Sequence, residues 1–182
     1  VMSPGMEIIQ KHFDPHPELE DQLRAKGKEN LLHHLSPFEN IKFSYVIQED
    51  PRGDGHAILQ AHDKLKGEPF AVLFGDDIIA HETPALSQLM NIYKETGNPV
   101  IASENVPTDR IHMYGVIDPG EITDRHIQVK GLVEKPQTHE APSNFGVIGK
   151  YICTPEVLEH LMKGESSNAG EQRLIDAFRS ML

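Results

Sequence analysis

The sequence predicts an α/β fold in which a mixed, mostly parallel β-sheet is flanked by helices. Short apolar runs alternate with longer helical stretches along the 182 residues, which is the pattern of helices packed against a sheet. The run at 69–74 is almost uniformly apolar, as in a parallel strand covered on both faces. The last three expected strands follow one another without a long helix between them, which predicts that part of the sheet departs from the doubly wound pattern.

Each element is expected from its local pattern of residues. Residues 41–47 are β-branched and aromatic with partial alternation, which favours a strand. Thr154-Pro155-Glu156 has the pattern of an N-cap followed by proline at the first helical position. Strands are expected at 41–47, 69–74, 99–104, 113–118, 126–134 and 145–152. Helices are expected at 4–13, 17–25, 29–35, 56–65, 83–96, 154–162 and 170–181.

The loop at 48–55 joins the first expected strand to an Ala/Leu-rich helix. It contains Gly53 and Gly55, which lack a Cβ and therefore let the backbone adopt positive φ and approach a flat base or a phosphate. The start of the following helix carries partial positive charge. The loop therefore predicts a nucleotide-handling site.

A carboxylate pair, Asp76 and Asp77, follows the apolar run at 69–74. Ligands of open α/β sheets collect outside the carboxyl ends of the strands, and carboxylates there can hold Mg²⁺ against phosphate oxygens. The pair by itself is more typical of a solvated turn, and only the neighbouring motifs favour a metal site.

Three further motifs give the chain a specific resemblance. The Gln-x4-Gly-x-Gly-His-Ala loop and the Gly-Asp strand end are followed by three more motifs in order. These are Tyr-Gly-Val-Ile at 114–117, Val-Glu-Lys-Pro at 133–136 and Ser-Asn-x-x-x-x-Gly-x-Tyr at 143–151. In this order they resemble the bacterial UTP–glucose-1-phosphate uridylyltransferases along nearly the whole chain. The resemblance implies a Rossmann-like nucleotidyltransferase fold.

On the nucleotide side, the resemblance assigns roles to three residues. Gln48 matches a glutamine that hydrogen-bonds the pyrimidine edge, and a side-chain amide offers both a donor and an acceptor for this. Gly53 matches a glycine packed under the base. Asp76 matches the Mg²⁺ ligand, so the resemblance implies Mg²⁺ as cofactor.

On the sugar side, the resemblance assigns Gly115 to a position beside the hexose and Glu134 to hydrogen bonds with the sugar hydroxyls. Lys135 matches the ammonium that meets the phosphate of the sugar phosphate. The implied reaction is in-line attack of glucose 1-phosphate on the α-phosphorus of UTP, giving UDP-glucose and pyrophosphate. This chemistry needs positioning and charge stabilisation, for which Asp76 and Lys135 are the expected catalytic residues.

The chain also departs from the family pattern. It contains no Gly-x-Gly-Thr-Arg phosphate loop, so we expect a central portion of a longer protein, truncated at both ends and weakly active or inactive alone. We expect a single partial domain over 1–182, with a nucleotide-binding part at about 1–110 and a sugar-binding part at about 111–182. Arg173 and Ile175 stand where the family has Gln and Thr, which puts the contacts near the sugar in question.

Composition sets the remaining expectations. The net charge of −11 without a basic patch argues against nucleic acid as a partner. The single cysteine, Cys153, fits a reducing cytoplasm, and no apolar run reaches membrane-spanning length. Edge strands left exposed by a missing first strand would need cover, which predicts a homo-oligomer. Among the eleven histidines, His12 and His16 have i, i+4 spacing, but Pro15 and Pro17 argue against one helix through both, so no zinc site is predicted.

Two other functions remain open from the sequence. A related thymidylyl or guanylyl transferase would carry similar motifs, because the residues present do not determine the base and hexose. A non-catalytic module that binds a sugar nucleotide would also retain them.

Overall fold

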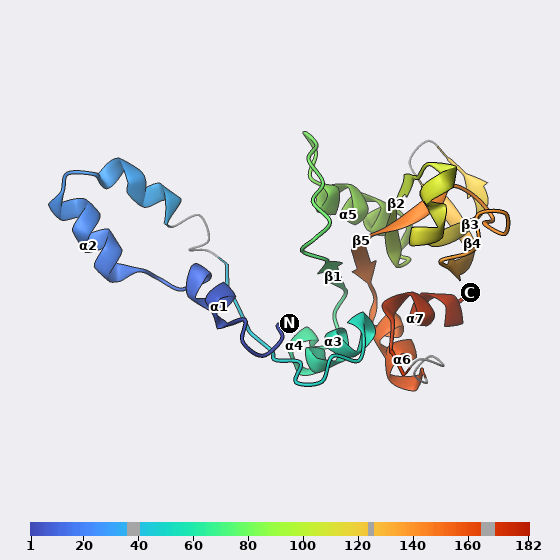
Figure 1. The fold of residues 1–182 in the computed structure, drawn as a ribbon, viewed down its shortest axis with the longest axis horizontal. Coiled ribbons are helices and arrows are strands. Elements are labelled where there is room, and N and C mark those ends of the chain that lie inside the picture. The colour runs from blue at the N-terminus through green and yellow to red at the C-terminus, as the bar shows by residue number, and fades with distance from the viewer. Residues whose placement is uncertain (36–40, 124–125, 165–169) are drawn as a thin grey trace. The chain divides into compact units, whose positions relative to one another are not determined.

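The computed structural model describes residues 1–35, 41–123, 126–164 and 170–182. Two compact units make up the chain, Val1–Pro51 and Arg52–Leu182, and each is described by itself. Figure 1 traces both units along the chain. The expected division at about residue 110 separates a nucleotide-binding part from a sugar-binding part. It is a different division from that into compact units, and it stays a prediction.

The first unit is helical. Its helices are α1 (Glu7–Phe13), α2 (Pro17–Ala25) and the 3-10 helix η1 (Glu29–His34). Asp14, which precedes Pro15, is extended and ends α1, as expected from the clash of a proline ring with a helical residue before it. Pro17 then occupies the first position of α2, where its missing N–H costs nothing. The three helices expected here are therefore confirmed, the third as a 3-10 helix.

The prediction of a strand at 41–47 is wrong. Its only β-pairing among the described residues is a single parallel bridge between Met2 and Ile47. The aromatic side chains of the segment pack instead, with the Phe43 and Phe13 rings stacked at a centroid distance of 4.7 Å. Aromatic content raises the strand propensity of a segment, but without a neighbouring ladder that propensity does not produce a strand.

The second unit contains the sheet and the remaining helices. The expected helix at 56–65 is divided at Ala61 into α3 (Asp54–Gln60) and α4 (His62–Leu65), and the 3-10 helix η2 (Thr108–Met113) was not expected. The strands are β1 (Phe70–Leu73), β2 (Val100–Asn105), β3 (Gly115–Ile122), β4 (Ile127–Glu134) and β5 (Phe145–Cys153). The helices are α3 (Asp54–Gln60), α4 (His62–Leu65), α5 (Ala85–Thr96), the 3-10 helix η2 (Thr108–Met113), α6 (Pro155–Lys163) and α7 (Leu174–Ser180). Five expected strands and the expected helices of this unit are thus confirmed with shifted ends.

The α/β class is confirmed, but the mostly parallel direction of the strands is wrong. The sheet has the order β1-β5-β3-β4, with β2 also paired to β5, and every ladder between these strands is antiparallel. The reason is that β5 lies between β1 and β2, as the pairs of Phe70 with Cys153 and Val100 with Ile152 record. Strands β1 and β2 run in the same direction, as the sequence suggests, but they are not neighbours.

The core of this unit forms where α3, α6 and α7 meet the sheet. These helices contact one another, α6 contacts β5 and α7 contacts β4, while α5 contacts β2 and β5. The main cluster of buried apolar residues comprises Ile58, Ile117, Leu132, Tyr151, Cys153, Val157, Leu158, Leu161, Leu174, Ala177 and Phe178. Helix α7 is therefore anchored from within the core, close to the end of β4. None of the helices in the described ranges is both long and apolar enough to cross a bilayer.

Candidate functional site

The glycine loop before α3 is joined to the segment that precedes α7. The Gln172 backbone nitrogen donates to the Arg52 carbonyl at 2.8 Å, and the His56 backbone nitrogen donates to the Gln172 carbonyl at 3.2 Å. Asp54 adds a carboxylate that accepts from two backbone nitrogens, those of Gly55 at 2.7 Å and Leu174 at 2.9 Å. Two segments far apart in the sequence are thereby held in one fixed register.

The glycines of the loop permit this close approach. Gly53 has φ +102°, and a Cβ on it would collide with the carbonyl oxygen of Gln172. A Cβ on Gly55 would lie 2.7 Å from Leu161 Cδ2 and 2.9 Å from the carbonyl carbon of Arg173. Gly53 is therefore required by the backbone of this chain, whatever it contacts in a ligand. Its expected place under a base stays a prediction.

The ends of β3 and β4 bring the residues of the expected sugar side together. Gly115 and Glu134 are paired in the β3–β4 register, and Glu134 Oε2 lies 3.1 Å from the position of a Cβ on Gly115. Lys135 follows with φ +45°, its backbone nitrogen donates to the Tyr114 carbonyl at 3.0 Å, and its side chain is exposed. A carboxylate, an ammonium-bearing side chain and a glycine thus lie close together where β3 begins and β4 ends.

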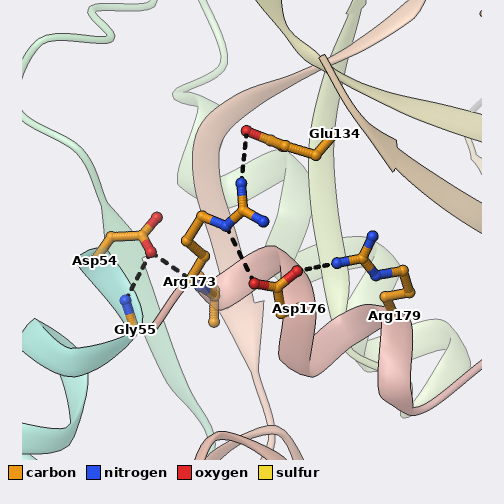
Figure 2. Close-up of polar contacts among 7 residues, drawn as sticks. Asp54, Gly55, Glu134, Arg173, Asp176 and Arg179 are labelled. Atoms are coloured by element: carbon orange, nitrogen blue, oxygen red, sulfur yellow. Dashed lines mark hydrogen bonds and ion pairs between the residues drawn. The ribbon is translucent and has the colours of Figure 1, made fainter. Parts of the chain in front are cut away.

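Arg173 joins this strand end to α7, as Figure 2 shows. Its Nη1 forms an ion pair with Glu134 Oε1 at 3.5 Å, and its Nε donates to Asp176 Oδ2 at 3.1 Å. The other oxygen of Asp176 accepts from Arg179 Nη2. Two carboxylates and two guanidinium groups therefore alternate, with a formal sum of zero charge.

This network affects the ionisation of Arg173. Partial burial alone lowers the pKa of the guanidinium, but the hydrogen bond to Asp176 and the charges of Asp176 and Glu134 raise it by more. The pKa of Arg173 therefore lies above its ordinary value, and the group is a permanent cation beside Glu134.

Ile175 also reaches this strand end. Its Cδ1 lies 2.6 Å from the position of a Cβ on Gly115, so the isoleucine covers part of the face that a glycine leaves open. The two positions at which the chain departs from the family pattern, Arg173 and Ile175, therefore contact the two residues expected beside the hexose.

The ionisation of the buried Tyr151 is affected by carboxylates from three elements. Burial first, and then the charges of Asp54, Asp77 and Glu134, raise the pKa of its phenol. These carboxylates come from the start of α3, the turn after β1 and the end of β4. Three carboxylates from separate elements therefore act electrostatically on one buried phenol.

The two aspartates after β1 have different surroundings. Asp77 Oδ2 accepts from the Gly149 nitrogen at 2.6 Å, and Lys150 Nζ donates to the Phe74 carbonyl at 2.7 Å. Asp77 is therefore a structural residue that ties the turn to β5. Asp76 is exposed, and its carboxylate has no partner in the described ranges, so it is available to a cation.

The donor set for a cation is small. Among the described residues, no group of three or more His, Cys, Asp or Glu side chains is placed to hold a metal ion. A single carboxylate nevertheless fits Mg²⁺, which commonly takes one or two carboxylates together with water and substrate phosphates. Asp76 fits that requirement, and the expectation of no zinc site stays a prediction.

Gln48 belongs to the first unit. Its side chain is buried, at 8% exposure, and its backbone nitrogen donates to the Met2 carbonyl at 2.8 Å. Its expected contact with a pyrimidine is untested and stays a prediction.

The sequence reasoning missed two residues of this region. Asp54 lies inside the glycine loop, and only the fold reveals that it holds Leu174. Arg173 stood out as a departure from the family pattern, which was the available signal, but its partner Glu134 was not foreseeable from spacing.

Comparison with curated proteins finds close relatives. The chain is 45% identical to the UTP–glucose-1-phosphate uridylyltransferase of Staphylococcus haemolyticus (strain JCSC1435) over 174 residues, covering 95% of the chain and 60% of that protein. It is 42% identical to the enzyme of the same name from Bacillus subtilis (strain 168), with the same coverage. The chain thus spans 60% of the length of these relatives.

Comparison with solved structures gives the same group. A crystal structure of apo UDP-glucose pyrophosphorylase matches with a TM-score of 0.91 and 35% identity, covering 98% of the chain and 67% of that protein. A putative glucose-1-phosphate thymidylyltransferase from Bacillus anthracis matches with a TM-score of 0.61 at 20% identity, over 78% of the chain and 53% of that protein, which is a likeness of fold alone. The family model described as nucleotidyl transferase matches residues 8–182. The chain therefore belongs to the nucleotidyl transferase family.

Proposed function

We propose that this chain carries the nucleotide and sugar sides of an enzyme that transfers uridylyl from UTP to glucose 1-phosphate. The observation that supports this most is the 42–45% identity to enzymes of that name along 95% of the chain. UTP and glucose 1-phosphate would be its substrates, and UDP-glucose and pyrophosphate its products. A solved relative from Acinetobacter baumannii is described as UTP-bound, and another relative is described as complexed with UDP-glucose.

The roles of the sugar-side residues follow the family resemblance, and the chemistry of these residues supports them. Glu134 would accept hydrogen bonds from hexose hydroxyls, because its Oε2 has no partner among the described residues. Gly115 would present only backbone to the hexose, beside Ile175, whose Cδ1 lies 2.6 Å from the position of an added Cβ. Lys135 would place its ammonium against the phosphate of glucose 1-phosphate, since its side chain is exposed and carries the charge that a phosphate requires.

The nucleotide-side roles rest on the resemblance of the loop at 48–57. Gln48 would read the pyrimidine edge with its amide, and Gly53 would pass beneath the base. Asp76 would hold Mg²⁺, which when bound would neutralise charge on the phosphate oxygens of UTP.

In the reaction, an oxygen of the sugar phosphate would form a bond to the α-phosphorus of UTP while the bond to pyrophosphate breaks. No side-chain nucleophile or net proton transfer is required. The residues of the chain would hold two polyanions in line and stabilise the charge that develops between them. Lys135 would supply that stabilisation from the sugar-phosphate side.

We further propose a cytoplasmic homo-oligomer that binds neither nucleic acid nor membrane. The single, buried cysteine supports the cytoplasmic location, and the acidic net charge supports the absence of nucleic-acid binding. Leu73 on β1, a strand with a single ladder partner among the described residues, is 50% exposed, and such an edge favours cover by another subunit.

Calorimetric titration of the chain with nucleotide sugars in the presence of Mg²⁺ tests the proposal. We expect UDP-glucose to bind at least about tenfold more tightly than dTDP-glucose or GDP-mannose, which corresponds to about 1.4 kcal/mol. Asp76→Asn should weaken the enhancement by Mg²⁺, whereas Asp63→Asn on the exposed surface of α4 should not. Equal affinity for the three nucleotide sugars, or none for UDP-glucose, would contradict the proposal.

A further inference from the structure

We propose that Arg173 is a specificity-determining residue that contacts the sugar directly. Its Nη2 donates to one hydroxyl of the hexose, while Glu134 Oε2 accepts from the neighbouring hydroxyl. The ligand feature recognised is therefore a vicinal diol on an uncharged hexose ring. The inference rests on the proposed function, because it assigns a further residue to the same sugar site.

The first support is the pairing of the two side chains. One oxygen of Glu134 is engaged by Arg173 Nη1 at 3.5 Å, and the other oxygen, beside Gly115, has no partner in the described ranges. On the guanidinium, Nε and Nη1 are engaged by Asp176 and Glu134. Figure 2 shows the third nitrogen, Nη2, without a dashed line. Among the described residues, one acceptor and one pair of N–H donors thus have no partner on two side chains that already form an ion pair.

This combination suits adjacent hydroxyls. A hydroxyl both donates and accepts, so a carboxylate oxygen and a guanidinium N–H can each take one member of a diol. The side chains of Arg173 and Glu134 are 28% and 22% exposed, which leaves them accessible to a ligand while part of their hydration is already removed. Hydrogen bonds that involve charged groups are the stronger ones in such surroundings.

The second support is that Arg173 is held in place before any ligand arrives. Asp176 accepts from its Nε at 3.1 Å, and Asp54 fixes the next backbone nitrogen, that of Leu174, at 2.9 Å. A side chain held in this way loses little conformational freedom on binding. The glycine loop therefore contributes to the sugar site through Arg173.

The charge of the cluster indicates which sugars fit. Glu134 and Asp176 are balanced by Arg173 and Arg179, so the cluster offers no excess positive charge to a sugar carboxylate. A neutral hexose can use its donors and acceptors without disturbing the ion pairs. A uronic acid would instead compete with Glu134 for Arg173, at the cost of leaving a partly buried carboxylate unpaired.

The test measures binding of UDP, UDP-glucose and the 2-, 3- and 4-deoxy analogues of UDP-glucose by calorimetry. The variants are Arg173→Gln, which removes the charge, and Arg173→Lys, which keeps the charge without the guanidinium fork. Arg179→Gln is the matched control. It removes an arginine that pairs with Asp176 in the same network, and it leaves the ion pair between Arg173 and Glu134 in place. Circular dichroism of each variant verifies the fold.

We expect Arg173→Gln to weaken UDP-glucose binding about tenfold and to change UDP binding by less than about twofold, as for the loss of a hydrogen bond to a charged group. Arg173→Lys should recover part of the loss, and Arg179→Gln should stay within about twofold of the unaltered chain. One deoxy analogue should bind weakly to the unaltered chain and lose nothing more in Arg173→Gln, which identifies the hydroxyl that Nη2 contacts.

The outcomes separate this inference from the proposed function. If the unaltered chain fails to bind UDP-glucose, the proposed function fails and this inference fails with it. If the unaltered chain binds UDP-glucose and Arg173→Gln binds it equally well, or loses UDP and UDP-glucose affinity to the same extent, only the role of Arg173 is overturned. Tighter binding of UDP-glucuronic acid than of UDP-glucose would overturn the preference for an uncharged hexose.

Discussion

The Asp54 carboxylate accepts a hydrogen bond of 2.9 Å from the backbone nitrogen of Leu174, 120 residues further along the chain. The same oxygen accepts from the Gly55 nitrogen, so one atom joins the start of α3 to the start of α7. Arg173 immediately precedes Leu174. The position of its guanidinium beside Glu134 therefore depends on this contact as well as on its own ion pairs.

Removing the Asp54 carboxylate should destabilise the second unit. Asp54→Ala leaves the nitrogens of Gly55 and Leu174 without their acceptor in a part-buried setting, which should lower the free energy of unfolding by about 2–3 kcal/mol. Urea denaturation measures this as a lower midpoint. Asp63→Ala removes a side chain that is 98% exposed and should change stability by less than about 0.5 kcal/mol. Equal effects of the two substitutions would contradict the role of Asp54.

A Cβ at Gly53 should be far more damaging than one at Gly67. Both glycines have positive φ, +102° and +71°, but only at Gly53 does the added atom meet backbone, that of Gln172. Gly67→Ala should cost about 1 kcal/mol for its backbone conformation alone. Gly53→Ala should cost at least about 3 kcal/mol, because the loop and the 172–174 segment must separate. Thermal and urea unfolding of both variants compare the two values, and similar losses would show that the close approach is unimportant.

The buried ammonium of Lys150 should stabilise the end of β1. Its Nζ donates to the carbonyls of Phe74 at 2.7 Å and Gly149 at 3.2 Å, and the residue is 8% exposed. Lys150→Met should lower the free energy of unfolding by about 1–3 kcal/mol, because both carbonyls lose a charged donor. Lys163→Met, at a side chain 72% exposed, serves as the control and should be nearly neutral. No difference between the two lysine variants would refute the structural role of Lys150.

Stability should fall at high pH because of Cys153. Burial raises the pKa of its thiol from 9.0 to about 12, so the unfolded chain releases this proton at lower pH than the native chain. The contribution is fully present below pH 9 and is lost as the pH rises from about 9 to about 12, by up to about 1.4 kcal/mol per pH unit. Between pH 8 and pH 10, the unaltered chain should lose about 1.4 kcal/mol more than Cys153→Ala. Parallel stability curves for the two proteins would rule this out.

Elements whose signals are local were predictable. Proline at the first position predicted the starts of α2 and α6. The apolar run at 69–74 predicted β1. None of these predictions required the packing partner of the element. The strands expected at 113–118 and 126–134, which carry Gly115 and Glu134, were also found, while the sugar-binding roles of these two residues stay predictions. These signals are carried by neighbouring residues, because helix capping and side-chain periodicity act over a few residues.

Three features depended on contacts between distant parts of the chain. Strand direction was decided by the insertion of β5 between β1 and β2. The segment at 41–47 has a single bridge and no ladder among the described residues. The guanidinium of Arg173 lies beside Glu134 in a part of the chain where Asp54 also holds the start of α7. Strand pairing and ion pairing are set by which surfaces the whole core brings together. No spacing along the sequence encodes that choice, so residue patterns located the chemistry while packing determined its partners.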